Sequence, residues 1–286
     1  MGTDLAKVLR RAERPVPYRI DDLGRVLVTG ARGSVGRAMV DRLVGTQVLA
    51  TDLDSLDVRD AEAVRRCMVT WEPEVVFHLA GAKHAPHGED DPFGVVETNV
   101  TGTRNVLRYA PRGSRVVMAS TCKACNPETA YGASKLVAER MVLNAGGVVV
   151  RYYNVVETQG NVFELWESIP PDDPIPVTSC CRFFVSLREA VALTLAAAAL
   201  PPGRYTVDPG ERTWMPNVAT RLYGSERKQV EIAPRRGDRL VEPRKGSHER
   251  LLSLEPPLQR IVSPHDGREN DSSTITSEQK EAEGGS

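Results

Sequence analysis

Short apolar runs alternate with amphipathic stretches through residues 23–153. The apolar runs have the continuous hydrophobic character of strands that are buried on both faces, and the stretches between them have the spacing of helices. The runs are Val26–Val28, Gln47–Ala50, Glu74–Gly81, Arg115–Met118 and Gly147–Tyr152. This alternation predicts an α/β fold with a doubly wound parallel sheet.

Two connections in this region have a distinct pattern. Asp57–Asp60 follow the second apolar run so closely that we expect a bare loop between the second and third strands, with helical periodicity only from Ala61 to Thr70. A long helix is predicted over Asp91–Tyr109. It contains Asn99, which we expect to be buried and to link this helix to the strand at Arg115–Met118.

The two ends of the chain differ from this core. Residues 1–22 are predicted to form an N-terminal arm with a short charged helix that ends near Arg14, where two prolines follow. Residues 263–286 are polar and rich in glycine and charge, so we expect a disordered tail there.

The pattern also changes after residue 153. A proline-rich loop at Ile169–Pro176 precedes an alanine-rich helix at Leu187–Leu200, and Arg204–Val207 and Gln229–Ile232 have the character of short strands. We therefore expect a smaller substrate-binding lobe. It is predicted to comprise residues 154–178 and 201–262, with residues 179–200 returning to the core.

Composition narrows the function classes. The 286 residues carry 37 basic and 38 acidic side chains, so no bulk field favours nucleic acid or a membrane surface. No apolar run approaches the roughly 20 residues of a spanning helix, and the N-terminus lacks a signal-peptide core, so we expect a cytoplasmic protein with a small-molecule partner. The five cysteines are odd in number and show no framework spacing, so we expect free thiols. Cys122 and Cys125 could form half of a zinc site, but no second cysteine or histidine pair has ligand spacing.

A glycine-rich loop follows the first apolar run. Gly30, Gly33 and Gly36 permit a tight turn, the close approach of a pyrophosphate and close helix packing, which is typical of a Rossmann-type dinucleotide site. Asp52 ends the next run, where a carboxylate bonds ribose hydroxyls and repels a 2′-phosphate. Asp52 favours NAD, whereas Arg32 could meet the 2′-phosphate of NADP, so both cofactors stay open.

Further residues fall at the same edge of the predicted sheet. Small side chains at Ala80 and Gly81 let the backbone approach a cofactor. Lys83 and His84 come next, in a loop that would face the same cleft.

The segment after Arg115–Met118 carries the candidate chemistry. Tyr131 and Lys135 are four residues apart and share one face of a helix, so the lysine charge would favour the phenolate and make a base for a substrate hydroxyl. The hydroxyl of Ser120 or Thr121 is placed to hold the substrate oxygen.

Together these features resemble the extended short-chain dehydrogenase/reductases, and within them the polysaccharide-biosynthesis group that includes inverting UDP-N-acetylglucosamine 4,6-dehydratases. The resemblance rests on four motifs: His78–Pro86, Thr98–Thr103, Asn126–Lys135 and Arg182–Phe184. It implies a cofactor site formed by Gly30, Arg32, Gly33, Ser34, Val35, Gly36, Asp52, Asp57, Val58, Leu79, Ala80, Gly81, Lys83, Asn99, Tyr131 and Lys135.

The resemblance also implies a reaction on a UDP-sugar. Tyr131 would take the proton of the C4 hydroxyl while hydride passes to the nicotinamide, and Lys135 would lower the pKa of the tyrosine. Loss of the C5 proton and of the C6 hydroxyl would follow, carried by an Asp-Lys pair in the family. Here that pair is Cys122 and Lys123. The thiol could still donate a proton, and Lys123 would be a base if burial and Lys135 depress its pKa.

The substrate contacts follow from the same resemblance. Asn154 is expected near the phosphates, Arg182 and Arg235 would clamp the pyrophosphate, and Lys83, His84 and Ser120 complete the set. Gln159 stands where relatives have arginine. Because Cys122 departs from the family, a C4 or C5 epimerase, a 5,6-dehydratase that gives an unsaturated sugar, and a catalytically silent dinucleotide-binding protein are alternatives. A homo-oligomer is expected from the family.

Overall fold

The computed structural model describes residues 3–13, 18, 23–83, 85–235, 238–242 and 249–252, with the backbone alone at 85–87 and 249–252. The predicted tail at 263–286, His84 and part of the predicted arm lie outside these residues. Among the helices of this part of the chain, none is long and apolar enough to cross a membrane.

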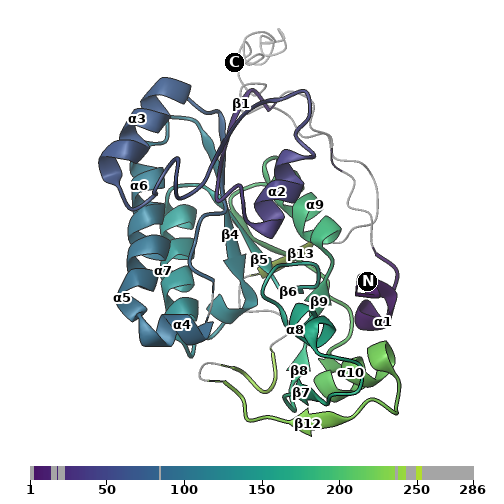
Figure 1. Ribbon diagram of the computed structural model, residues 1–286. Helices are drawn as coiled ribbons and strands as arrows, with labels where there is room; N and C mark the ends of the chain where they lie inside the picture. Colours follow the sequence, from purple (N-terminus) through teal and green to yellow (C-terminus); the bar gives the residue numbers. More distant parts are fainter. Residues whose placement is uncertain are drawn as a thin grey trace, which may run out of the picture.

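A seven-stranded parallel sheet forms the centre of the molecule (Figure 1). Its strand order is β13-β10-β5-β4-β3-β1-β2. The strands are β1 (Arg25–Thr29), β2 (Gln47–Thr51), β3 (Val75–His78), β4 (Arg115–Thr121), β5 (Val148–Tyr152), β10 (Gly203–Val207) and β13 (Glu249–Leu252). The chain order reverses between β1 and β3, the switch point at which dinucleotides bind in doubly wound folds. The predicted fold class is confirmed.

Helices cover both faces of this sheet (Figure 1). On one face lie α2 (Ser34–Val40) and α9 (Leu187–Ala197), which pack on each other and bury the apolar side chains of one strand face. On the other lie α3 (Ala61–Trp71), α6 (Gly102–Tyr109) and α7 (Ala130–Asn144). Two short helices, α4 (Ala85–Asp90) and α5 (Pro92–Val96), pack against α7 and extend this second layer.

A smaller lobe packs beside the carboxyl edge of the sheet (Figure 1). Three pairs of short strands hold it together: β6 (Asn154–Val155) with β9 (Phe184–Val185), β8 (Cys181–Arg182) with β11 (Thr213–Trp214), and β7 (Ile175–Val177) with β12 (Gln229–Glu231). Its helices are α8 (Val162–Ser168) and α10 (Met215–Tyr223). Phe163, Trp166 and Phe184 are the aromatic centre of its core.

The N-terminal helix belongs to this lobe. The predicted arm helix is α1 (Leu5–Leu9), shorter than expected because Arg10 adopts a left-handed conformation that ends it. Val8 and Leu9 are buried in the lobe core. Arg11 then pairs with the buried carboxylate of Glu189 at the start of α9, so this end of the chain joins the lobe to the sheet layer.

Two predictions about strands are wrong. Residues 57–60 form a turn rather than lead into a third strand, and the third strand is β3, which α3 connects to β2 as an ordinary crossover helix. Residues 204–207 were expected in the lobe, but they lie in β10, which pairs with β5 through Gly203–Tyr205. The physical reason is that β10 buries Tyr205 and Val207 in the main core, a placement that only long-range pairing reveals.

The predicted helix over Asp91–Tyr109 is divided into three parts. A π-helical turn, η1 (Glu97–Thr101), separates α5 from α6 and contains Asn99. Single π turns inside α-helices are frequent at functional sites, because the wider turn re-aims one side chain. Here that side chain is Asn99.

Candidate active site

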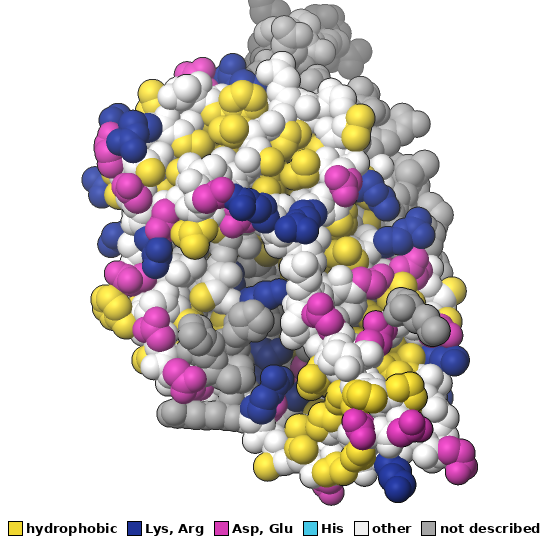
Figure 2. Space-filling model, in the orientation of Figure 1, with side chains coloured by type: hydrophobic (Ala, Val, Ile, Leu, Met, Phe, Trp, Pro, Cys, Tyr) yellow, Lys and Arg dark blue, Asp and Glu magenta, His cyan; other side chains and the backbone are white. Residues whose placement is uncertain are grey.

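Lys and Arg side chains gather along a hollow between the larger body and the smaller lobe (Figure 2). The carboxyl ends of β1, β3, β4 and β5 point towards this region, where α/β folds bind their ligands.

Helix α7 places Tyr131 and Lys135 at this edge. Its first turn is fixed by Thr129, whose hydroxyl accepts a hydrogen bond from Gly132 N at 3.0 Å. Both candidate side chains are buried, at 7% and 5% exposure, and Lys135 Nζ donates to the carbonyl of Ala119 in β4 at 3.1 Å. The predicted pair is therefore anchored to the end of the central strand.

The cation that acts on Tyr131 is not the one expected from the sequence. Burial lowers the pKa of Lys135 to about 8. Burial raises the pKa of Tyr131, and the cation that opposes this rise is Lys123, assisted by a hydrogen bond from Thr121. The expected effect of Lys135 on the tyrosine is thus taken over by Lys123, because the ammonium of Lys135 is directed at Ala119.

Of the two hydroxyls expected to hold a substrate oxygen, only Thr121 faces Tyr131. Ser120 Oγ donates to the buried carboxylate of Glu139 at 2.5 Å, so the Ser120 hydroxyl is not available to donate to a substrate oxygen. Successive residues of a strand point to opposite faces, so Ser120 and Thr121 lie on opposite faces of β4.

Cys122 and Lys123 lie on a short 3-10 turn, η2 (Cys122–Ala124), directly after β4. The Cys122 side chain is 6% exposed, and burial together with the charge of Glu242 raises its pKa to about 12, so it is a neutral thiol. Burial lowers the pKa of Lys123, but Cys122, Glu242 and Tyr131, in that order of size, together outweigh burial, so this pKa is raised. The expected depression of this pKa by burial and Lys135 is therefore wrong, and Lys123 is an ammonium at neutral pH.

Glu242 is a residue of this site that the sequence did not reveal. Its carboxylate accepts hydrogen bonds from Asn154 Nδ2 at 3.0 and 2.9 Å and from Phe183 N at 3.0 Å. Arg182 Nε lies 3.7 Å from it. Nothing in the local sequence, Leu240–Glu242, distinguishes this glutamate from a surface residue, so only the tertiary contacts identify it.

The two arginines expected to bind a pyrophosphate share a second carboxylate, Asp238. Arg182 Nη2 lies 3.9 Å and Arg235 Nε 3.3 Å from it. Arg182 is largely buried, whereas the Arg235 side chain is 70% exposed, so the structure brings the first into the site and leaves the second at its rim. Asn154, predicted near the phosphates, is engaged with Glu242 and with Phe183 O at 2.9 Å.

The glycines around this site have backbone neighbours or side chains so close to them that any larger residue at the same positions would clash. A Cβ at Gly30 would lie 2.6 Å from Ala80 N, and one at Gly36 would lie 2.3 Å from Gly30 O. At Gly81 a Cβ would lie 2.7 Å from Lys135 Nζ and 2.9 Å from Asn99 Oδ1. This cradle fits a dinucleotide, because a pyrophosphate and a nicotinamide ribose need bare backbone, which here lies next to Lys135.

Asp52 lies at the far end of this cradle. Its carboxylate accepts hydrogen bonds from Arg32 N and Leu53 N, each at 2.8 Å. The Arg32 side chain is paired with Asp54. The arginine that could bind a 2′-phosphate is thus already neutralised.

Asn99 joins three segments around the cradle. It accepts a hydrogen bond from Ala82 N at 2.9 Å and donates to Ala82 O at 3.1 Å and to Ser134 Oγ at 3.0 Å. The predicted link therefore runs to the loop after β3 and to helix α7, not to strand β4, because the π turn aims the amide at this loop.

Other predicted cofactor residues take several positions. Leu79 N and Ala80 N donate to the backbone carbonyl and the hydroxyl of Thr29, which seats their loop on β1. Val58 is buried against α6, and Asp57 pairs with Arg59, whose guanidinium lowers the pKa of that carboxyl. That Asp57 and Val58 contact a cofactor stays a prediction.

The loop at Gln159 crosses the cradle from the lobe. Gln159 N donates to Ser34 Oγ at 3.1 Å, and Gln159 O accepts from Lys83 Nζ at 3.2 Å. Ser34 and Lys83 therefore contact the lobe as well as the cofactor side, and Val35 begins α2 beside them.

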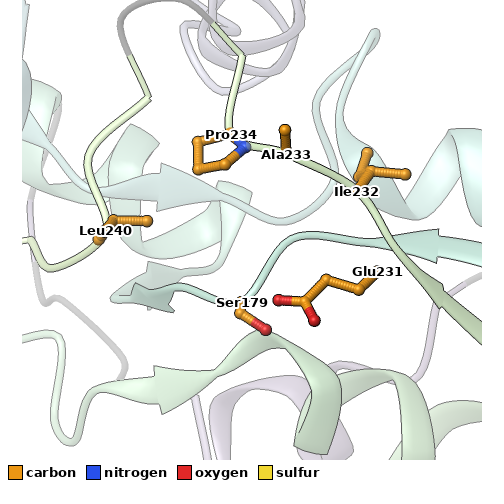
Figure 3. Close-up of a pocket in the computed structure, with 6 residues that line it drawn as sticks. All are labelled: Ser179, Glu231, Ile232, Ala233, Pro234 and Leu240. Atoms are coloured by element: carbon orange, nitrogen blue, oxygen red, sulfur yellow. The ribbon is translucent and has the colours of Figure 1, made fainter.

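A separate recess of about 460 Å³ lies in the lobe (Figure 3). Glu231, Ile232, Ala233 and Pro234 line one side, and Ser179 and Leu240 lie opposite, with the side chains of Glu231 and Ser179 directed towards each other. Its volume is in the range of ligand sites, and Pro234 immediately precedes Arg235.

A comparison with known proteins now decides the family. The sequence profile of the family described as "Polysaccharide biosynthesis protein" matches residues 52–255. The chain belongs to this family. The predicted resemblance is confirmed.

Two curated relatives show the range of the likeness. The chain is 30% identical to the probable polysaccharide biosynthesis protein EpsC of Bacillus subtilis, over 76% of this chain and 44% of that protein. It is 27% identical to a UDP-N-acetylglucosamine 4,6-dehydratase (inverting) of Campylobacter jejuni, over 60% of this chain and 62% of that protein. The chain thus spans about half of the length of these two relatives.

A solved structure agrees with the fold. The UDP-glucose 4-epimerase of Thermus thermophilus, in complex with NAD, superposes with a TM-score of 0.68 at 23% identity, over 76% of this chain and 89% of that chain.

Proposed function

We propose that this polysaccharide biosynthesis family member is an NAD-dependent nucleotide-sugar dehydratase. Its substrate would be a UDP-sugar such as UDP-N-acetylglucosamine, oxidised transiently at C4 and dehydrated across C5 and C6. The observation that carries the proposal is the juxtaposition of two proton-transfer pairs: Tyr131 and Lys135 on α7, and Cys122 and Lys123 on η2, around one buried site beside Gly81.

The first pair suits oxidation of an alcohol. Tyr131 takes the proton of the C4 hydroxyl, and the Thr121 hydroxyl and the Lys123 charge favour the phenolate that this requires. Bound NAD supplies the hydride acceptor and returns the hydride at the end. Lys135 lies against Gly81, where it is placed to hold the nicotinamide ribose.

NAD rather than NADP is proposed from the two residues at the adenosine end. Asp52 presents a carboxylate where the ribose hydroxyls bind, and Arg32 is already paired with Asp54. A 2′-phosphate would meet the negative charge of Asp52 there.

The second pair suits loss of water. A ketone at C4 makes the C5 proton acidic, so solvent water can take that proton while the C6 hydroxyl leaves as water with a proton from Lys123. The C5–C6 double bond then accepts the returning hydride at C6 and a solvent proton at C5, and solvent reprotonates Lys123. Lys123, as an ammonium, is suited to protonate the departing C6 oxygen. Arg182 and Arg235 are proposed to hold the pyrophosphate, and the recess beside Arg235 the nucleoside.

The epimerase reading is favoured by one observation, the thiol at position 122. A group that is neutral and hard to ionise replaces the carboxylate of the family pair, so oxidation at C4 without water loss would leave inversion as the outcome.

One experiment separates these readings. The purified protein is incubated with UDP-N-acetylglucosamine and NAD in deuterated water, and the products are analysed by mass spectrometry and proton NMR. We expect a product lighter by one water molecule, with deuterium at C5. An unchanged mass with altered stereochemistry would support the epimerase, and NAD binding without oxidation of any UDP-sugar would support a non-catalytic protein. Tyr131→Phe serves as the matched control, since it keeps the ring and removes the proton acceptor.

A further inference from the structure

His78 is a buried titratable residue to which the proposed reaction gives no role. It ends β3, it is 1% exposed, and its ring lies between two threonine hydroxyls. Nδ1 lies 2.8 Å from Thr29 Oγ1 at the end of β1, and Nε2 lies 3.0 Å from Thr103 Oγ1 in α6. Burial lowers the pKa of His78 to about 3, and the charge of Lys135 adds to this effect, so the ring is neutral at physiological pH. A neutral imidazole carries one ring proton, and the two threonines decide which nitrogen holds it.

Thr103 places that proton on Nε2. Its hydroxyl donates to the carbonyl of Asn99 at 2.7 Å, which is a stronger acceptor than the thioether of Met118 at 3.8 Å. Because a hydroxyl has a single proton, Thr103 Oγ1 cannot also donate to the ring. It therefore accepts the proton of His78 Nε2.

The contacts of Thr29 agree with this tautomer. Thr29 Oγ1 accepts a hydrogen bond from Ala80 N at 3.3 Å and donates its own proton to the unprotonated Nδ1 of His78. With the proton on Nδ1 instead, Thr29 would accept from both neighbours, and its hydroxyl proton would have no acceptor among the described residues. The donors of the chain thus all point in one direction, from the amide of Ala80 to the carbonyl of Asn99.

The two ends of this hydrogen-bonded chain meet around Gly81. Ala80, on one side of the glycine, is held at the first end. Ala82, on the other side, is held by the side chain of Asn99, which accepts from Ala82 N at 2.9 Å and donates to Ala82 O at 3.1 Å. Both neighbours of the bare backbone in the cradle are therefore fixed by one chain, and His78 is at its centre.

We propose that His78 is a positioning residue for the dinucleotide cradle: with its proton on Nε2, it holds both neighbours of Gly81 in place and keeps this backbone against Lys135. A ligand that contacts bare backbone binds best when that backbone is ordered in advance. The inference rests on the proposed function for the identity of the ligand, NAD. The position of the proton and the order of the cradle can be measured without a ligand.

The position of the proton is tested on the full chain by NMR. Replacement of the other four histidines with glutamine leaves His78 as the only imidazole, and ¹⁵N labelling with long-range ¹H–¹⁵N correlation spectra shows which ring nitrogen is protonated. We expect the Nε2–H tautomer, unchanged from about pH 5 to about pH 8. A proton on Nδ1, or a ring that becomes charged in this range, would overturn the inference.

The affinity for NAD tests the positioning role. Thr29→Val keeps the shape and removes the hydroxyl between His78 and Ala80, so we expect NAD to bind about tenfold more weakly, the effect of one lost buried hydrogen bond. Thr206→Val is the matched control, because Thr206 is also buried and donates to Arg151 O at 2.9 Å, in β10, which β5, β4 and β3 separate from β1. It should bind NAD as the wild type does. Equal affinities of the two variants, measured by isothermal titration, would contradict the proposal.

A double variant tests whether the histidine couples the two threonines. Thr29→Val and Thr103→Val each break the chain through His78, so the double variant should weaken NAD binding by clearly less than the product of the two single effects. Independent effects, which multiply, would show that the threonines act separately and that the ring does not link them.

A wild-type protein that binds no dinucleotide would refute the proposed function, and the order of the cradle then takes the place of affinity as the readout. Amide hydrogen exchange at Ala80 and Ala82 should be faster in Thr29→Val than in the wild type, and unchanged in Thr206→Val. Exchange that is the same in Thr29→Val and in the wild type would overturn the role of His78, whatever the ligand.

Discussion

The carboxylate of Glu139 accepts two hydrogen bonds from the guanidinium of Arg151, at 2.7 and 2.6 Å, and both side chains are buried. Glu139 lies one turn beyond Lys135 on α7, and Arg151 lies on β5, so the pair fixes α7 to the sheet. Ser120 and Arg204 complete the network with hydrogen bonds to the same carboxylate. This network positions the helix that carries Tyr131.

The Glu139–Arg151 pair predicts a large loss of stability on removal of one partner. Glu139→Gln would leave the buried charges of Arg151 and Arg204 without an anion, and we expect the free energy of unfolding to fall by about 3–5 kcal/mol. Urea unfolding followed by circular dichroism measures this. Glu62→Gln is the matched control, since Glu62 pairs with Arg65 on the exposed surface of α3 and should remain close to wild type. Equal losses in the two variants would contradict the prediction.

We expect the substitution of buried Lys135 to stabilise the fold while it removes the proposed activity. Its pKa is about 8 in the folded protein, against 10.5 ordinarily, so below about pH 8 the fold holds a buried charge that the unfolded chain carries at no cost. Lys135→Met should therefore raise the free energy of unfolding near pH 7, by at most about 3 kcal/mol, less about 1 kcal/mol for the lost hydrogen bond to Ala119.

The pH dependence checks the cause of this effect. The folded protein loses the Lys135 proton above about pH 8 while the unfolded chain keeps it until about pH 10.5, so the advantage of Lys135→Met should shrink as the pH rises through that window. Lys228→Met, at an exposed lysine, should show no such trend. A constant difference across the window would remove burial of charge as the explanation.

The parts of the fold that the sequence predicts are those in which local periodicity is sufficient. Strands β1 to β5 are continuous apolar runs, and their spacing shows the α/β alternation. Strand β10 was misplaced because its assignment depends on pairing with β5, a contact between segments far apart in the chain. The turn at residues 57–60 was misread for the opposite reason, since Val58 is apolar and buried but packs against α6 rather than in a strand.

The site divides in the same way. Tyr131 and Lys135 could be paired from sequence because four residues make one helical turn. Ser120 and Thr121 could not be separated, because their roles depend on which face of β4 each residue occupies. The charge of Lys123 depends on groups from α7, β8 and residues 238–242, so its sign could be obtained only from the tertiary arrangement.

Position 122 predicts a variant series. Because the Cys122 thiol is neutral and Lys123 carries the charge, we expect Cys122→Ala to retain water loss within about tenfold. Lys123→Met should abolish water loss and also slow oxidation at C4, because the lysine charge favours the Tyr131 phenolate. Cys122→Asp should add a second carboxylate beside Lys123 and extend activity to higher pH. Product analysis by mass spectrometry checks each variant. Abolition of water loss in Cys122→Ala, with rescue by Asp, would instead make the thiol the acid.

Asp52 predicts the cofactor preference. Asp52→Asn removes the charge that repels a 2′-phosphate, so NADP should bind more tightly than it does to the wild type and NAD less tightly. Asp54→Asn frees Arg32, which should further favour NADP. Isothermal titration with each dinucleotide measures both effects. Unchanged preference in the two variants would place the adenosine end of the cofactor elsewhere.

Asp238 predicts how the site responds to a pyrophosphate. Its carboxylate lies between Arg182 and Arg235, so it occupies with its own charge the place where the two arginines would meet an anion. A bound pyrophosphate must compete with it, and Asp238→Asn should therefore strengthen binding of UDP several-fold and make that binding more sensitive to salt, because more arginine charge is free for the ligand. Isothermal titration with UDP at two salt concentrations measures both quantities.

Glu128→Gln is the control, since Glu128 pairs with Arg239 and with neither Arg182 nor Arg235. Weaker binding in Asp238→Asn would show instead that Asp238 orients Arg235 for the ligand.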